Sequence, residues 1–175
     1  DYSQRLQWLS NFSGSAGEVL ITKNKAYLFV DGRYTLQAKI EVNQKLYKVY
    51  NYSEKTLIEI LKSLKLKKIN FGIDGNIITI KKLTLLNSGL DTKIVVKLLE
   101  KNLIDLIWQN RPKIKRSIVW NYHQNFHGSK TFKKIQNMKI LIKKHSAQYL
   151  LVTSNESICW LLNLRGEDLA YTPIF

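Results

Sequence analysis

Short β-rich runs alternate with helix-forming segments through the first part of the chain. The expected strands are residues 18–22, 26–30, 47–50, 68–74 and 92–98. The expected helices are residues 35–40, 54–65, 79–86 and 102–108. Such alternation is typical of an α/β fold, in which helices cover the faces of a sheet. The sequence therefore predicts a mixed sheet flanked by helices, in a unit that ends near residue 100.

Local signals predict where these elements begin and end. The polar turn at residues 23–25 joins the first two strands into a hairpin. Asp31 is expected to cap the helix that follows the second strand, with Arg33 in its first turn. Ser53 is the expected N-cap of helix 54–65, and residues 87–89 are expected to stop helix 79–86.

The periodic pattern is lost after Arg111-Pro112, because a residue before proline is disfavoured in a helix. The later elements are an amphipathic helix at 129–144, a buried strand at 149–153 and a short helix or turn at 157–164. One helix and one strand cannot cover both faces of a sheet. We therefore expect a complete first domain at 1–105, a linker at 106–128 and an incomplete second domain at 129–175.

Charge and composition limit the classes of partner. A formal net charge of +15 raises the possibility of nucleic acid or an acidic membrane surface. All but five of the 28 basic residues are Lys, at spacings expected of solvated helix faces. They include Lys65, Lys67, Lys133, Lys134, Lys139, Lys143 and Lys144. We therefore expect neither a nucleic-acid partner nor a membrane partner.

Location is predicted from three features that the sequence lacks. No apolar run approaches the roughly 20 residues that a membrane span needs. The N-terminus does not resemble a secretory signal. Cys159 is the only cysteine, so an intramolecular disulfide is impossible, and its apolar surroundings predict a buried thiol. A reducing cytoplasm fits these features best.

Candidate chemistry is sparse. His123 and His127 could share a metal only if their segment were helical, and the glutamate of a metalloprotease helix is absent. Residues 13–17 lack the pattern of a phosphate-binding loop or a nucleophile elbow. They predict a tight loop in which Gly14 and Gly17 adopt backbone angles closed to other residues. No catalytic residue and no metal ligand is predicted.

Four segments together resemble the aminopeptidase P family of Xaa-Pro aminopeptidases, in order and spacing. They are residues 8–17, Asp31-Gly32-Arg33-Tyr34 with Gln37-Ala38, residues 102–112, and residues 160–166 with Asp168 and Pro173. The chain departs from the family at Ser10-Asn11, where the family has Thr-Gly, and at Phe29-Val30, where it has Trp-Thr. Asn11 tolerates left-handed backbone angles, so the first loop is expected to keep its shape.

The resemblance implies two creatinase N-terminal-like domains, the second one incomplete here. It implies that a further C-terminal domain binds two divalent metal ions, usually manganese, so that this chain holds no cofactor. The intact metallopeptidase would release the first residue of peptides with proline in second position. This chain would be its non-catalytic N-terminal region, shaping access to the active site and contributing contacts to a homodimer.

The substrate-access candidates implied by the resemblance are Trp8, Arg33, Tyr34 and Arg165. Scaffolding is the alternative, since Arg33 and Arg165 could satisfy carboxylates or carbonyls where domains meet. The family also has a strand and a helix before the first motif, and a domain without them would expose a sheet edge. A stand-alone binding or regulatory module, a basic nucleic-acid-binding protein, and a pseudo-enzyme partner of a separate catalytic chain remain alternatives for the whole.

Overall fold

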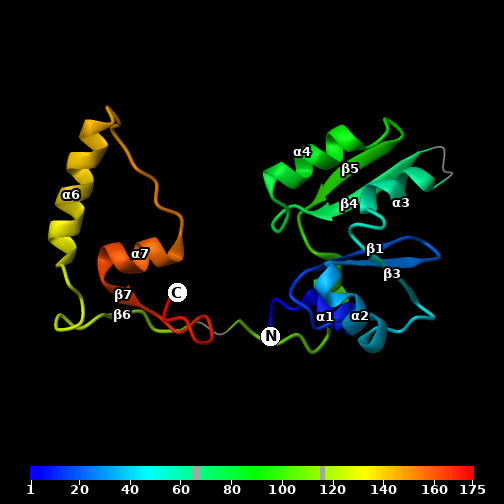
Figure 1. The fold of residues 1–175 in the computed structure, drawn as a ribbon, viewed down its shortest axis with the longest axis horizontal. Coiled ribbons are helices and arrows are strands. Elements are labelled where there is room, and N and C mark those ends of the chain that lie inside the picture. The colour runs from blue at the N-terminus through cyan, green and yellow to red at the C-terminus, as the bar shows by residue number, and fades with distance from the viewer. Residues whose placement is uncertain (65–67, 115–116) are drawn as a thin grey trace. The chain divides into compact units, whose positions relative to one another are not determined.

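A computed structural model describes residues 1–64, 68–114 and 117–175. The chain divides into two compact units, Asp1–Pro112 and Lys113–Phe175 (Figure 1). The boundary between the units falls inside the segment 106–128 that was expected to be a linker.

The first unit contains a three-stranded sheet of order β1-β2-β3. Strand β1 (Gly17–Ile21) runs antiparallel to β2 (Ala26–Val30), with Gly17 opposite Val30, so the predicted hairpin is confirmed. Strand β2 pairs in parallel with β3 (Tyr47–Asn51). A parallel pair needs a crossover connection. It is provided by the 3-10 turn η1 (Gly32–Tyr34) and helix α2 (Thr35–Glu41).

A second pair of strands lies in the same unit. Strand β4 (Ile69–Asp74) runs parallel to β5 (Ile94–Leu99), and helix α4 (Ile80–Gly89) connects them. Helix α3 (Leu57–Ser63) precedes β4, while α1 (Arg5–Ser10) and α5 (Leu103–Ile107) lie near the two ends of the unit's sequence.

The core covers both faces of β2. Leu28 and Val30 pack in a cluster with Ala38 of α2, together with Phe12. Tyr27 and Phe29 point to the opposite face because side chains alternate along a strand. That second cluster contains Leu20, Leu57, Ile60, Leu61, Leu86 and Ile94. Helices therefore flank the sheet, and the predicted α/β class is confirmed.

The predicted start of α3 was wrong. The N-cap is Thr56 rather than Ser53, and it forms a capping box with Glu59. The Glu59 amide donates to Thr56 Oγ1 at 3.3 Å, and the Thr56 amide donates to Glu59 Oε2 at 2.7 Å. This reciprocal pair satisfies two of the otherwise unpaired amides at the helix start. Lys65, the last residue of the predicted helix, and Lys67 lie outside the described residues.

The predicted stop of α4 was also wrong, because the helix continues through Asn87 and Ser88 to Gly89. Gly89 does not have a positive φ. A Cβ atom there would lie 2.9 Å from Ile58 Cδ1 of α3. The glycine is therefore explained by close packing of α4 on α3 rather than by a helix stop.

Within its described residues, the second unit contains two helices and a short antiparallel pair of strands. Strand β6 (Trp120–Asn121) pairs with β7 (Leu164–Arg165), so part of the segment expected to be a linker is paired with the end of the chain. Helices α6 (Thr131–Lys144) and α7 (Asn155–Leu162) contact each other. Both lie where helices were expected, and Ser154 caps α7.

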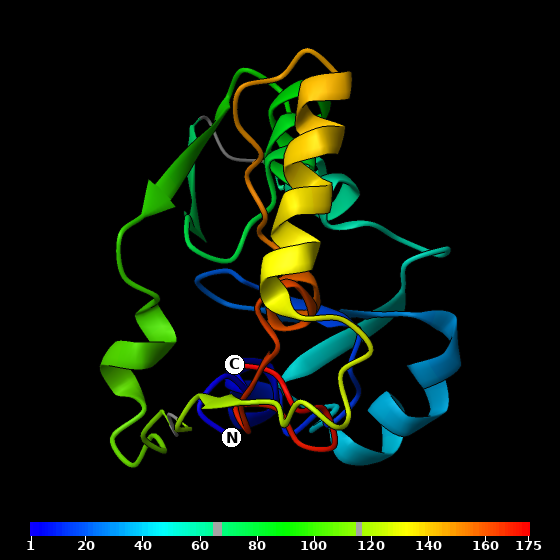
Figure 2. The same cartoon turned by 90° about the vertical axis from the view of Figure 1, so that its left-hand side faces the viewer.

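The strand expected at residues 149–153 is absent, and this prediction was wrong. Figure 2 shows an irregular connection between the end of α6 and the start of α7. Tyr149 is 91% exposed and Leu151 is 85% exposed. β-Propensity measures how well side chains fit a half-buried pleated surface beside a neighbouring strand. Within the described residues no strand pairs with this segment, so its β-rich composition does not produce a strand.

Candidate functional site

The loop after α1 keeps the shape expected for a left-handed Asn. Asn11 has φ 63° and ends α1. The expectation for the glycines was wrong, since neither Gly14 nor Gly17 has a positive φ. Close packing explains them instead: a Cβ atom at Gly14 would lie 2.2 Å from Phe12 Cζ. The buried Phe12 ring therefore occupies the space that any larger residue would need.

Glu41 anchors this loop from the end of α2. Its carboxylate accepts the Ser13 amide at 2.8 Å and the Ser13 hydroxyl at 2.7 Å. The Gln37 side chain also donates to it, at 3.0 Å. The hydrogen bonds from Ser13 lower the pKa of Glu41 below its usual value. The carboxylate thus serves as a fixed acceptor for the loop.

The turn after β2 carries two of the predicted site residues. Asp31 Oδ1 accepts the Arg33 amide at 3.0 Å and Arg33 Nε at 2.8 Å, so the predicted cap is confirmed. The hydrogen bond with the Arg33 side chain lowers the pKa of Asp31. The Arg33 side chain is 73% exposed. The guanidinium can therefore contact a ligand at a small cost in free energy, because an exposed ion pair contributes little stability.

Tyr34 connects this turn to the first loop. Its hydroxyl lies 2.8 Å from Ser15 Oγ, and its ring meets Phe12 edge-on with centroids 5.8 Å apart. The Arg33 guanidinium lies 5.6 Å from the centroid of the Tyr34 ring. Arg33 and Tyr34 therefore form one surface with residues 13–17, and its groups can donate hydrogen bonds and offer positive charge.

Trp8 lies in a different set of contacts. It is 41% exposed and stacks on Trp108, with centroids 5.3 Å apart and planes at 20°. Arg111 lies 5.8 Å from the Trp108 ring and ion-pairs with Asp105 at 2.7 Å. Trp8 thus joins α1 to the end of α5. No role in such contacts was predicted for Asp105 or Arg111 from the sequence, since Arg5 and Tyr2, which they also contact, lie about 100 residues away along the chain.

Arg165 belongs to the second unit and contacts the C-terminal end of α7. Its Nη1 donates to the carbonyls of Cys159 at 3.2 Å and Leu164 at 2.7 Å. The guanidinium lies 4.2 Å from the centroid of the Tyr122 ring. A cation near a helix C-terminus is favourable. Cys159 is 2% exposed, so its predicted burial is confirmed.

Lys134 was expected on a solvated helix face, and that prediction was wrong. The residue is 6% exposed. Its ammonium donates to the Trp160 carbonyl at 2.5 Å and to Asn163 Oδ1 at 2.6 Å. Burial lowers the pKa of Lys134, and nearby Arg165 acts in the same direction. The sequence did contain a signal for this burial. Lys134 is spaced four residues from Met138 and eight from Ile142, so the three lie on one face of the helix, and that face points inward.

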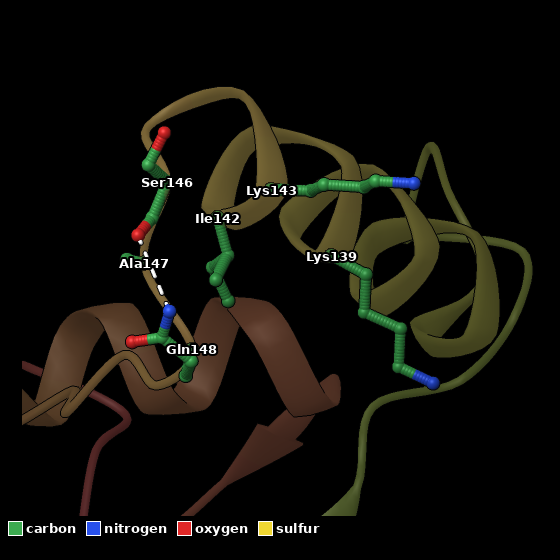
Figure 3. A pocket seen from close by; sticks show the side chains of 6 residues that line it. All are labelled: Lys139, Ile142, Lys143, Ser146, Ala147 and Gln148. Atoms are coloured by element: carbon green, nitrogen blue, oxygen red, sulfur yellow. Dashed lines mark hydrogen bonds between the residues drawn. The ribbon is translucent and has the colours of Figure 1, made fainter.

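A hollow of about 430 Å³ lies at the end of α6. Its lining residues are Lys139, Ile142, Lys143, Ser146, Ala147 and Gln148 (Figure 3). Gln148 donates to the Ser146 carbonyl at 3.4 Å, while the two lysine side chains extend away from Ile142. The lining has no carboxylate, thiol or imidazole that could serve as a base or nucleophile. It is therefore a poor candidate for a reaction site.

Metal ligands do not gather in the part of the chain that the structure describes. Among residues 1–64, 68–114 and 117–175, no group of three or more His, Cys, Asp or Glu could hold an ion. The segment of His123 and His127 is a turn, and the Asn125 amide donates to His123 Nδ1 at 3.3 Å. Over the same described ranges, no helix has the length and apolar character to cross a membrane.

Known families and proteins match nearly the whole length of the chain. Two family models, both described as the creatinase/prolidase N-terminal domain, match residues 2–105 and 110–175. A probable Xaa-Pro aminopeptidase P of Laccaria bicolor is 34% identical over 98% of this chain, which covers 27% of that protein. Xaa-Pro aminopeptidase 1 of Dictyostelium discoideum is 33% identical over 98% of this chain and 29% of its own length.

A solved structure of an aminopeptidase also matches nearly the whole chain. The X-prolyl aminopeptidase of Caenorhabditis elegans, described as a cytosolic enzyme with a di-nuclear active site, matches 99% of this chain with a TM-score of 0.82 and 27% identity. The match covers 29% of that enzyme. The chain thus spans less than a third of the length of these relatives.

Proposed function

The chain belongs to the creatinase/prolidase N-terminal domain family, and on that premise we propose that it works as the non-catalytic N-terminal region of an Xaa-Pro aminopeptidase. The supporting observation is the match of nearly the whole chain, both units included, to the C. elegans enzyme. Both family matches also follow one another along the sequence in the order of the two units.

The whole protein, on this proposal, is a cytoplasmic hydrolase that removes a first residue followed by proline. Proline fixes its own φ and offers no backbone N–H donor, so the scissile tertiary amide needs a dedicated pocket. Two divalent ions, manganese in this proposal, would activate water and polarise the carbonyl. Their ligands would lie outside this chain, since no suitable group occurs among the described residues.

Access to the active site is the role proposed for Arg33 and Tyr34. An exposed guanidinium beside a tyrosine hydroxyl can bind peptide carbonyls or a C-terminal carboxylate. The exposure of Arg33 and its contact with Tyr34 support this role. The contacts of Trp8 and Arg165 instead favour the scaffolding alternative, because each binds a neighbouring element of its own unit. We also propose that this region contributes contacts to a homodimer.

The mass of the gene's product in its own cell tests the proposal. Immunoblotting followed by intact mass spectrometry should detect a species several times heavier than the 20.4 kDa of this chain. The relatives, of which the chain covers 27% and 29%, lead to that expectation. A product close to 20.4 kDa would contradict it. The function would then have to be sought in a stand-alone module or a separately encoded partner.

A further inference from the structure

Two arginines from distant parts of the first unit share one carboxylate. Arg5 Nε and Nη2 donate to Asp105 Oδ1 at 2.6 Å and Oδ2 at 2.9 Å. Arg111 Nη1 lies 2.7 Å from the same Oδ2. The side chains of Arg5, Asp105 and Arg111 are 19%, 26% and 13% exposed. Partial burial and two-pronged geometry make such an arrangement stronger than an ordinary surface ion pair.

Aromatic rings extend this arrangement to the start of the chain. The Arg111 guanidinium lies 3.6 Å from the centroid of the Tyr2 ring, and its Nε donates to the Tyr2 carbonyl at 3.1 Å. Trp8 stacks on Trp108 beside it. We call Tyr2, Arg5, Trp8, Asp105, Trp108 and Arg111 the junction cluster.

Helix α5 depends on these contacts because it buries little of itself. It has five residues and no fully buried one. Leu103, Leu106 and Ile107 are 62%, 66% and 60% exposed. Helix α1 buries only Ser10. Short helices gain most of their stability from tertiary packing. With so little apolar burial, α5 is positioned mainly by the polar and aromatic contacts of the junction cluster. Helix α1 shares these contacts and is held as well by Leu6, which packs on the core, and by the Tyr47 hydroxyl, which donates to the Leu9 carbonyl at 2.7 Å.

The junction cluster joins the first residues of the first unit to its last ones, since the unit ends at Pro112, directly after Arg111. We propose that the junction cluster is a conformational device that fixes where the chain leaves the first unit. While Tyr2 and Arg5 are in place, the chain leaves the first unit after residue 112. When they are displaced, residues 103–112 join the connection to the second unit and lengthen it by the reach of ten extended residues, at most about 35 Å.

Hydrogen exchange of the 175-residue chain tests this device at both of its ends. The reporters are the amides of Trp108, which donates to Ile104 at 2.9 Å, and of Asn11, which donates to Gln7 at 2.8 Å. Asp105→Asn removes the ion pairs made from α5, and Tyr2→Ala removes the ring contact made from the start of the chain. Each should speed exchange at both reporters by about tenfold, because local opening becomes easier. Chymotryptic cleavage after Trp108 should increase in parallel.

A surface ion pair of the same unit provides the control. Lys82→Gln removes the contact with Glu18 and should leave both reporters unchanged. Arg111→Lys keeps a charge for Asp105 but loses the planar stack on Tyr2, so it should give a smaller increase and remains informative if Asp105→Asn does not fold. A response confined to the altered end would overturn the proposal. So would an equal increase throughout β2 and α3, which would indicate general destabilisation.

Discussion

Lys134 Nζ lies 4.2 Å from the centroid of the Trp160 ring and donates to the carbonyl of the same residue. One side chain of α6 thus contacts both the ring and the backbone at the end of α7. The cation also reaches Asn163, whose side chain donates in turn to the Ser129 carbonyl at 3.0 Å. These contacts connect the two helices of the second unit through buried polar groups.

Replacing Lys134 by Met should therefore destabilise the second unit. Met retains the packing volume but leaves Asn163 Oδ1 without the ammonium donor, while the Trp160 carbonyl keeps only the Asn163 amide, at 3.4 Å. A buried polar group left unpaired costs about 1–3 kcal/mol. Urea unfolding followed by the fluorescence of the chain's tryptophans measures the effect. Lys133→Met, at an exposed neighbouring position, should change the stability by less than about 0.5 kcal/mol. Equal stability of the two variants would contradict the role of Lys134.

Gly14→Ala should destabilise the first unit by about 1–3 kcal/mol, the usual cost of overpacking. The new Cβ would lie 2.2 Å from Phe12 Cζ, and Phe12 is only 1% exposed, so its ring cannot move into solvent. Gly128→Ala is the matched control, since no atom lies within 4 Å of its Cβ position. That change should be neutral or slightly stabilising. Thermal unfolding of both variants measures these changes in stability. An unchanged unfolding temperature for Gly14→Ala would contradict the prediction and show that the Phe12 ring can move aside.

The stability contributed by Asp105 should depend on pH in a defined direction. Hydrogen bonding to Arg5, with Arg111 contributing less, lowers the pKa of this carboxyl in the folded protein. Its contribution is therefore complete above the unfolded pKa of about 3.9 and is lost as the pH falls through the lower folded value. Asp105→Asn lacks this contribution at every pH. The stability difference between the two proteins, from urea titrations, should be large at pH 7 and shrink below about pH 4. A constant difference would contradict the ion-pair account.

Kinetics of the full-length gene product can separate access from scaffolding. Arg33→Ala should raise KM for an Xaa-Pro tripeptide with kcat little changed, since an access residue contributes to binding. Arg165→Ala should lower the unfolding temperature because it removes two carbonyl contacts, with KM unchanged for the folded fraction. Lys23→Ala, in the hairpin turn, is the control for a lost surface charge. An unchanged KM in Arg33→Ala would remove Arg33 from the access surface.

Local patterns predicted most elements of the fold. Alternating β-rich and amphipathic segments located the hairpin, strands β3, β4 and β5, and helices α2, α4, α6 and α7, because each depends on near neighbours in sequence. Helix α4 ends at Gly89, three residues past its expected end, and the glycine there is explained by packing against Ile58, which the local sequence does not specify. The strand at 149–153 failed because pairing depends on another strand, which a single segment does not specify.

The site was less accessible to sequence reasoning. The Asp31 cap and the proximity of Arg33 and Tyr34 follow from local spacing, and they could be predicted. The contact between Ser15 and Tyr34, the burial of Lys134 and the pairing of Asp105 with Arg5 depend on residues far apart along the chain. No local pattern specifies such pairs. A shared stripe with Met138 and Ile142 was the only hint for Lys134.

Peptide hydrolysis tests the central claim most directly. The 175-residue chain and the full-length product of the gene would be assayed side by side with Mn²⁺, on a tripeptide with proline in second position and on its alanine analogue. We predict no hydrolysis by the chain alone, and release of the first residue from the proline peptide by the full-length product. Manganese-dependent cleavage by the 175-residue chain, or a full-length product that does not cleave the proline peptide, would contradict the assignment.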